Sequence, residues 1–295
     1  MQKQQRLAIL VVLVVTIAAA SFALLATSGG GEDSKKTIRF GYVAWDGEIA
    51  STHVLTKVLE EAGYKVEMVN VDAGVLYQGL ADGELDITTS AWLPVTQKNY
   101  WDTYGAKIDS VSTNLEGCTV GLAVPTYMTD VNSIGDLANY SSQLDGRIVG
   151  IDPGAGMMAI TEDVVVEYGL SPNIELMASS SAGMLAELTK AYADREWIVV
   201  TLWTPHYAFD KWELKMLEDP LGLYGGAEHV ETLARQGFAQ DNPDANAIIG
   251  RFSWTLADIQ GVMLDIANGM DEEAAAQKWI DAHRDTVDYW LTGQA

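Results

Sequence analysis

Cysteine is nearly absent from this sequence, because Cys118 is the only one among 295 residues. A single cysteine excludes a disulfide within the chain. It lies in residues 117–122, whose sequence is typical of a strand, so we expect a buried and inert thiol. No cysteine follows the hydrophobic N-terminal run, so we do not expect the lipid-bearing cysteine of a bacterial lipoprotein.

Basic residues are also scarce, with 18 Lys and Arg against 41 Asp and Glu, a formal net charge of −23. Nucleic acid and anionic lipid surfaces bind proteins that present a basic footprint. The composition therefore argues against both partners and predicts a solvated acidic surface.

Catalytic motifs are missing as well. The sequence contains no Gly-x-Ser-x-Gly, no His-Glu-x-x-His and no Gly-x-x-x-x-Gly-Lys. The four histidines, at positions 53, 206, 229 and 283, are scattered without metal-ligand spacing. We therefore expect neither an enzyme nor a metal or cofactor site.

The N-terminus carries a long uncharged stretch, residues 7–26, preceded by Lys3 and Arg6. A membrane-spanning helix needs about 20 apolar residues, more than the h-region of most signal peptides. The stretch fits an uncleaved signal anchor with its positive end inside, although cleavage near Ala26 stays open. Residues 27–34 read as a flexible linker, so we expect a folded part that begins near Lys36, outside the cytoplasmic membrane.

Two series of elements follow one another in the same order. In each series the periodicity predicts strand, helix, strand, helix and strand. The first comprises residues 38–44, 48–62, 65–71, a short helix from 73, and 84–90. The second comprises residues 147–151, 155–168, 174–178, a helix from 181, and 197–202. The common order predicts two similar lobes, each with a βαβαβ core.

The remaining segments connect and complete these lobes. A short strand at residues 120–125 is expected to cross from lobe one to lobe two, and residues 228–238 to carry the chain back. We also expect helices at the ranges 132–139, 243–252, 255–268 and 271–290, the last with Trp279 and Trp290 in the core. The predicted domains are a signal or anchor with linker at 1–36, lobe one at 37–123 and 226–295, and lobe two at 124–225.

Three of the nine tryptophans stand out by position. Trp92 and Trp203 end matching strands just before a proline, and ligands of open α/β sheets bind at the carboxyl ends of strands. Trp254 lies where two predicted helices meet. Three indole faces around one cavity would hold a quaternary ammonium, which cannot donate hydrogen bonds, by cation–π attraction of about 0.5–2 kcal/mol per contact.

The other end of such a ligand can be placed too. Residues 46–49 open a helix, residues 152–156 form an equivalent turn in lobe two, and helix N-termini bind carboxylates. His206 would either donate one further hydrogen bond or cap the end of its strand. We expect the side chain of Glu48 to face solvent or to cap the helix, since it would repel a ligand carboxylate.

Five strings in order, at residues 42–51, 90–94, 150–156, 203–206 and 252–255, resemble the glycine betaine-binding, OpuAC-like substrate-binding proteins of ABC importers. The resemblance covers nearly all of residues 37–290. It implies a two-lobe α/β fold of the periplasmic-binding-protein type (type II), with the ligand in the cleft between the lobes. It also implies a cage of Trp92, Trp203 and Trp254, and a ligand carboxylate held by the amides of Glu48 and Ile49.

We therefore expect a membrane-tethered, extracytoplasmic receptor for glycine betaine that works with ABC permease and ATPase subunits. Choline, carnitine and proline betaine remain alternatives, because each presents a similar cation to the cage. A membrane-anchored osmolyte sensor is a different class, which we favour less because we expect no cytoplasmic output domain. An enzyme acting on a betaine would need a nucleophile and base that the sequence lacks.

Overall fold

The structure is a computed structural model that describes residues 36–294. The expected anchor at residues 7–26 and the linker at 27–34 lie outside this range. Residues from Thr37 onward form one compact unit. Within the described range, no helix has the length and apolar character needed to cross a membrane.

A parallel three-stranded unit opens the fold. Strand β1 lies in the middle and pairs in parallel with β2 on one side and β3 on the other. The bounds are β1 Thr37–Tyr42, α2 Asp46–Glu61, β2 Lys65–Asn70, α3 Ala73–Asp82 and β3 Ile87–Leu93. Helix α2 buries an apolar face that includes Val54, Leu55 and Val58. It ends before Gly63, whose φ of 92° is the left-handed conformation predicted for a glycine at that place.

The same unit recurs later in the chain, with β5 in the middle between β6 and β7. The bounds are β5 Arg147–Val149, α5 Gly156–Glu167, β6 Glu175–Met177, α6 Ser181–Asp194 and β7 Val200–Thr204. The strand order is thus 2-1-3 in the first unit and 6-5-7 in the second, each all parallel. The predicted pair of βαβαβ cores is confirmed.

Two antiparallel strands, β4 (Ile108–Pro125) and β9 (Glu228–Arg235), lie between these units in the sheet order β2-β1-β3-β9-β4-β7-β5-β6. Strand β4 pairs with β9 up to Cys118 and with β7 from Thr119 onward. Its end also pairs with β8 (Leu214–Met216).

The predicted crossing strand at residues 120–125 was too short. The first part of β4 contains several polar residues, namely Asp109, Ser110, Ser112, Thr113 and Asn114, which hid it from a hydrophobicity pattern. The change of partner at Cys118 lies close to the predicted lobe boundary at 123, and β9 begins two residues after the boundary at 226. The exact division into lobes stays a prediction.

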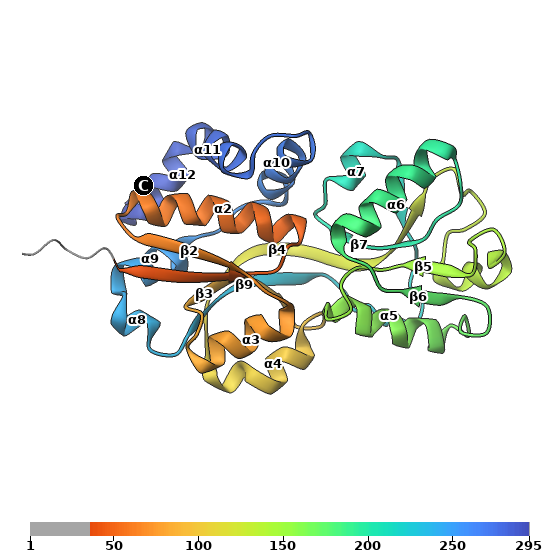
Figure 1. Ribbon diagram of the computed structural model, residues 1–295, viewed down its shortest axis with the longest axis horizontal. Coiled ribbons are helices and arrows are strands. Elements are labelled where there is room, and N and C mark those ends of the chain that lie inside the picture. Colours follow the sequence, from red (N-terminus) through yellow and green to blue (C-terminus); the bar gives the residue numbers. More distant parts are fainter. Residues whose placement is uncertain (1–35, 295) are drawn as a thin grey trace, which may run out of the picture. The chain divides into compact units, whose positions relative to one another are not determined.

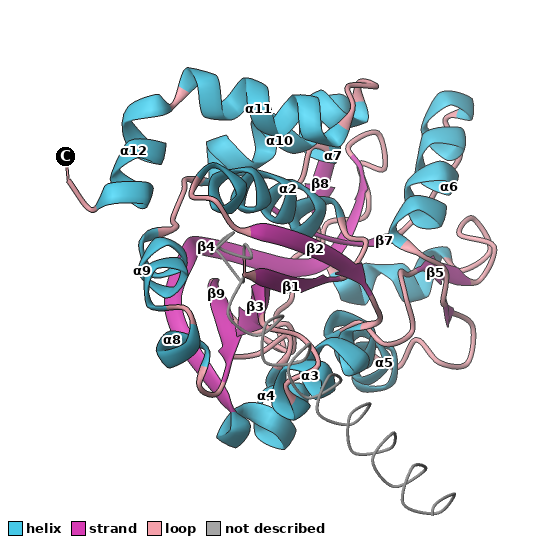
Figure 2. Ribbon diagram, turned by 60° about the vertical axis from the view of Figure 1, so that its left-hand side comes forward, coloured by secondary structure: helices cyan, strands magenta, loops and turns pink. Residues whose placement is uncertain are grey.

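Helices cover both faces of the sheet (Figures 1 and 2). We call β1–β3 with α2–α4 and α8–α12 the first group, and β5–β8 with α5–α7 the second group. In the first group α2 and α10–α12 lie on one face of the strands and α3 and α4 on the other. The remaining bounds are α4 Lys98–Tyr104, η1 Gly105–Lys107, η2 Ile134–Tyr140, α7 Ala208–Lys211, α8 Phe238–Asp241, α9 Pro243–Arg251, α10 Leu256–Ala267, α11 Glu272–Ala282 and α12 Arg284–Thr292.

The single C-terminal helix predicted at residues 271–290 is in fact two helices, α11 and α12, with a break at His283. The backbone of His283 is not helical, and its Nδ1 lies 2.8 Å from the carbonyl oxygen of Trp279. The break lets Trp290 stack on Trp279 with ring centroids 5.5 Å apart. Both indoles are buried, as predicted.

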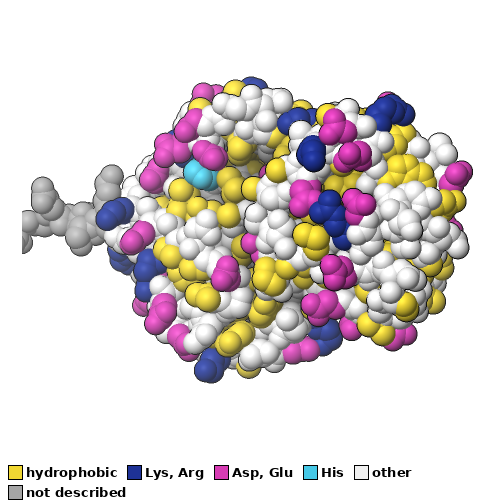
Figure 3. All heavy atoms as spheres, turned by 45° about the vertical axis from the view of Figure 1, so that its right-hand side comes forward, with side chains coloured by type: hydrophobic (Ala, Val, Ile, Leu, Met, Phe, Trp, Pro, Cys, Tyr) yellow, Lys and Arg dark blue, Asp and Glu magenta, His cyan; other side chains and the backbone are white. Residues whose placement is uncertain are grey.

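Two further predictions concern the buried, inert thiol of Cys118 and the acidic surface, and the structure agrees with both. The Cys118 side chain is fully buried, and burial raises the pKa of its thiol to about 12, so little reactive thiolate forms at neutral pH. Acidic side chains are scattered over the visible face of the molecule rather than gathered in one patch (Figure 3).

One carboxylate links strand β1 to strand β9 through two arginines. Asp86, whose side chain is only 6% exposed, accepts hydrogen bonds from Arg39 on β1 and Arg235 on β9. Arg235 Nε donates to Asp86 Oδ1 over 2.7 Å, and the backbone N–H of Arg39 donates to Asp86 Oδ2, also over 2.7 Å. Burial would raise the pKa of Asp86, but the bonds from both arginines outweigh it, so that the pKa lies below its usual value.

We expect Asp86→Ala to lower the free energy of unfolding by about 2–3 kcal/mol, because charge-assisted hydrogen bonds are lost and two arginines keep no shared acceptor. Since the pKa of Asp86 is lower in the folded state, its contribution is present above about pH 4 and lost as the pH falls through that lowered pKa. Urea unfolding at pH 7 and pH 3 should therefore show a smaller difference between variant and wild type in acid.

The exposed pair Lys98–Asp102 provides the matched control. Asp102→Ala should cost less than about 1 kcal/mol, as is usual for surface ion pairs. Equal losses in both variants would contradict the role assigned to Asp86.

Candidate ligand-binding site

A cavity lies where the two groups meet. The centre of a water-sized sphere can occupy about 50 Å³ of it, which is room for several waters or one compact organic molecule. The first group contributes Trp45, Gly47, Glu48, Ser51, Thr89, Ser90, Trp92, Thr96, Gln97 and Ile259, while Asn114 and Leu115 come from β4 and Val230 from β9. The later part of β4 contributes Val120. The second group contributes Ile151, Ala155, Gly156, Met157, Trp203 and Pro205. The cavity thus lies at the carboxyl ends of parallel strands in both groups.

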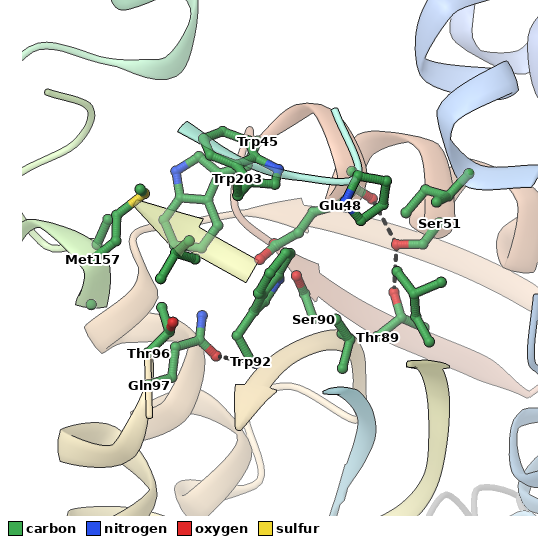
Figure 4. A pocket seen from close by; sticks show the side chains of 18 of the residues that line it. Trp45, Glu48, Ser51, Thr89, Ser90, Trp92, Thr96, Gln97, Met157 and Trp203 are labelled. Atoms are coloured by element: carbon green, nitrogen blue, oxygen red, sulfur yellow. Dashed lines mark hydrogen bonds between the residues drawn. The ribbon is translucent and has the colours of Figure 1, made fainter. Parts of the chain in front are cut away.

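Three indoles line this cavity (Figure 4). Trp92 belongs to β3, Trp203 to β7, and Trp45 lies between β1 and α2. Trp45 Nε1 donates a 3.0 Å hydrogen bond to Asp152 Oδ2 in the second group. The ring of Trp203 meets that of His206 edge to face, with centroids 4.7 Å apart.

Trp254, the third tryptophan of the expected cage, does not line the cavity. It is 8% exposed, packs edge to face on Trp279 at 5.8 Å, and borders a separate hollow beside residues 113–116. Sequence reasoning missed Trp45 instead. The signal was present, because Trp45 also follows the carboxyl end of a strand, as Trp92 and Trp203 do.

Glu48 faces the cavity, not solvent, so the expectation for its side chain was wrong. Helix α2 begins at Asp46, as expected for a helix opened by residues 46–49, and this places Glu48 in its first turn. The side chain is 3% exposed. The Val43 N–H donates to Oε2 over 2.6 Å, while Oε1 has no hydrogen-bond partner. Burial raises the pKa of Glu48 to about 8, against smaller opposing effects of Ser90 and Val43.

Ile49 does not line the cavity, and its N–H already donates to the Trp45 carbonyl over 2.9 Å. Gln97 was not anticipated, and no motif marks it in the sequence. Its Oε1 accepts from the Tyr77 hydroxyl at 2.8 Å and from the Trp92 N–H at 3.0 Å. Its Nε2 lines the cavity wall without a partner, in a side chain that is fully buried.

His206 is fully buried and does not line the cavity. Its Nδ1 accepts from the Ala208 N–H at 3.0 Å, which matches the capping role considered for it. Its Nε2 lies 3.4 Å from Asp46 Oδ2, and the Ser181 hydroxyl donates to that oxygen over 2.8 Å. Burial would raise the pKa of Asp46, but the interactions with His206 and Ser181 outweigh it and lower that pKa.

These contacts join the two groups around the cavity. The Tyr100 hydroxyl adds a 2.6 Å hydrogen bond to the Gly154 carbonyl. The closest approach involves Gly156, where an added Cβ would lie 1.8 Å from the carbonyl oxygen of Thr96. Only glycine allows the start of α5 to come this near to the loop after β3. Within residues 36–294, no group of three or more His, Cys, Asp or Glu side chains could hold a metal ion.

This fold and site define the chain as a substrate-binding protein with a mixed α/β, periplasmic-binding-protein-like fold. Residues 36–282 match the family model described as the substrate binding domain of ABC-type glycine betaine transport systems. The chain belongs to that family, as its motifs suggested.

Individual relatives agree with this assignment. The chain is 42% identical over 156 residues to the glycine betaine/carnitine transport binding protein GbuC of Listeria monocytogenes, a match that covers 52% of each. The match therefore spans about half the length of that relative. Lactococcal OpuAC in its closed, glycine betaine-bound conformation superposes with a TM-score of 0.83 at 41% identity, covering 88% of this chain and all of the other. A choline-binding protein of an ABC transporter, in complex with choline, gives 0.82 at 28% identity, covering 90% and 94%.

We expect Gly156→Ala to hold the two groups apart, since the new methyl group and the Thr96 carbonyl cannot occupy the same space. Spin labels on cysteines introduced at the exposed positions Val75 in α3 and Val166 in α5 would report the separation. Their mean distance should increase in the variant. Cys118 is buried and should remain unlabelled.

Gly154→Ala is the matched control two residues away. Its added Cβ would lie 3.7 Å from the Tyr100 hydroxyl, an ordinary contact, so the label distance should stay unchanged. The same distance in Gly156→Ala and wild type would show that the close approach does not govern the separation.

Proposed function

We propose that this chain is the solute-binding component of an ABC importer and that it binds glycine betaine in the cavity described above. The observation that carries the proposal is the meeting of Trp45, Trp92 and Trp203 in one cavity between the two groups. This trio replaces the one expected from the sequence, with Trp45 in the place of Trp254.

The chemistry of the lining favours a methylated cation. Indole faces attract a quaternary ammonium by about 0.5–2 kcal/mol per contact, and more when water is excluded. Glu48 is the only titratable side chain among the lining residues. A cavity with so little charge suits a ligand whose own positive and negative groups cancel, as those of a betaine do.

The ligand carboxylate has polar groups available in the same cavity. Gln97 Nε2 is a buried donor without a partner, and the backbone at Gly47 and Glu48 lies in the first turn of α2. The first N–H groups of a helix have no intrahelical acceptor and attract anions. These donors take over the role that the sequence assigned to the amides of Glu48 and Ile49.

A receptor in transport must also release its ligand. We propose closure of the two groups on the ligand, a closed form recognised by a permease, and ATP hydrolysis by a separate subunit. A micromolar Kd, about −8 kcal/mol, agrees with a few cation–π contacts and one held carboxylate after the costs of association. We place the protein on the outer side of the cytoplasmic membrane, with residues 7–26 as its proposed anchor.

Choline is the second candidate ligand. The choline complex that superposes with a TM-score of 0.82 supports it, and so does Glu48, a carboxyl group that could balance the charge of a net cation. Carnitine and proline betaine would present the same kind of cation to the indoles.

We expect Trp203→Ala to weaken glycine betaine binding by about tenfold or more, because one cation–π wall is lost. Tryptophan fluorescence titration would measure Kd, and far-UV circular dichroism would confirm folding. Trp254→Phe, outside the cavity, should leave Kd within about twofold of wild type. Unchanged binding in Trp203→Ala would sink the assignment, and a large loss in Trp254→Phe would restore the original trio.

Glycine should compete poorly with glycine betaine in the same titration. It has the carboxylate but lacks the three methyl groups, so its ammonium keeps strong hydration that indole faces cannot replace. Competition by glycine at concentrations similar to glycine betaine would argue against a cation–π site.

A further inference from the structure

We propose that the proton on Glu48 sets the charge class of the ligand: protonated Glu48 favours a net-neutral betaine, and ionised Glu48 favours a net-positive trimethylammonium alcohol such as choline. The inference rests on the proposed function of the cavity and adds a specificity-determining residue to it.

The position of Glu48 allows this role. Its carboxyl group forms part of the cavity wall, and Oε2 is occupied by the Val43 N–H. Oε1 is buried and has no hydrogen-bond partner of good geometry, although the Ser90 hydroxyl lies near enough to lower the pKa of Glu48, so Oε1 is the oxygen that a ligand can meet. Figure 4 shows the carboxyl group pointing into the space beside Trp92. A buried carboxyl oxygen without a partner is costly unless a ligand or a proton satisfies it.

Glu48 and Gln97 together offer two different hydrogen-bond patterns. With Glu48 protonated, its O–H and Gln97 Nε2 are both donors, which suits the oxygens of a carboxylate. With Glu48 ionised, one acceptor and one donor remain, which suits a hydroxyl group that both donates and accepts. The negative charge then also balances the uncompensated ammonium of the alcohol.

The elements that surround the cavity carry other ionisable groups, which do not line it. They are Asp46 on α2, Tyr77 on α3, Asp152 before α5, His206 after β7, Glu228 and Glu231 on β9, and Asp258 on α10. None of them lines the cavity, and each has a hydrogen-bond or ion-pair partner of its own. Glu48 is therefore the group through which protonation reaches the ligand directly.

Burial raises the pKa of Glu48 to about 8, so the protonation of this carboxyl group can be followed at pH values that the protein tolerates. A ligand carboxylate next to Glu48 raises this pKa further, so betaine binding takes up a proton and weakens as the pH rises through about 8. A net cation lowers it, so its binding releases a proton and strengthens with pH until Glu48 is ionised in the free protein.

Calorimetric titrations of glycine betaine and choline at pH 6, 7, 8 and 9 test the proposal. Between pH 7 and 9 the affinity of wild-type protein for glycine betaine should fall about tenfold, while that for choline rises. Repeating each titration in buffers of different ionisation enthalpy should give proton uptake for betaine and release for choline.

Glu48→Gln is the decisive variant, because it keeps the size of the side chain and cannot ionise. Whatever its Kd at pH 7, that value should stay constant within about twofold from pH 6 to 9 for both ligands. A pH dependence that survives in Glu48→Gln would belong to Asp46, His206 or another neighbour and would overturn the proposal.

Two further results are distinguishable from these. If the variant does not fold, the proton counts of the wild type decide alone, and zero proton exchange with either ligand contradicts the role of Glu48. If neither ligand binds at any pH, the proposed function fails rather than this inference from it.

Discussion

One long strand that changes its partner along the sheet is the constraint on which the rest of the structure depends. Strand β4 pairs with β9 up to Cys118 and with β7 beyond it, so the two groups of elements share a continuous backbone. Their parallel strands therefore end on either side of the same junction. The cavity follows from that placement, since both groups direct their carboxyl-terminal loops, with Trp45, Trp92 and Trp203, to one point.

The repeated series of strand, helix, strand, helix and strand was predictable, because period and turn residues are local signals. The length of β4 was not predictable from the sequence. Its polar residues are stabilised as a strand by pairing with β9, a partner more than a hundred residues away. The break at His283 was not predicted either, and Trp290 stacks on Trp279 across it. Local sequence patterns thus predict the type and order of the helices and strands, whereas tertiary contacts decide where each one begins and ends.

The site was predictable to a similar degree. Trp92 and Trp203 were found because a strand end is a position with a physical meaning. Trp45 also lies near the carboxyl end of a strand, but it is three residues beyond the end of β1 and directly precedes α2, so it was not recognised. Glu48 was misjudged because the repulsion argument assumed an ionised carboxylate, whereas burial raises the pKa of this side chain to about 8. Gln97 has no local signal, since its role comes from contacts with Tyr77 and Trp92.

The electrostatics of the cavity explain why its lining residues include one carboxyl group, that of Glu48, and no basic side chain. Burial disfavours its ionised form, and no cation among the cavity-lining residues compensates it. The same conditions make an arginine or lysine unsuitable, because either would repel a quaternary ammonium. The polar end of the ligand must then be held by neutral donors, namely an amide, a protonated acid or helix N–H groups. In the proposed mode of binding, such a cavity selects a ligand by its net charge, and the proton on Glu48 decides which net charge is favoured.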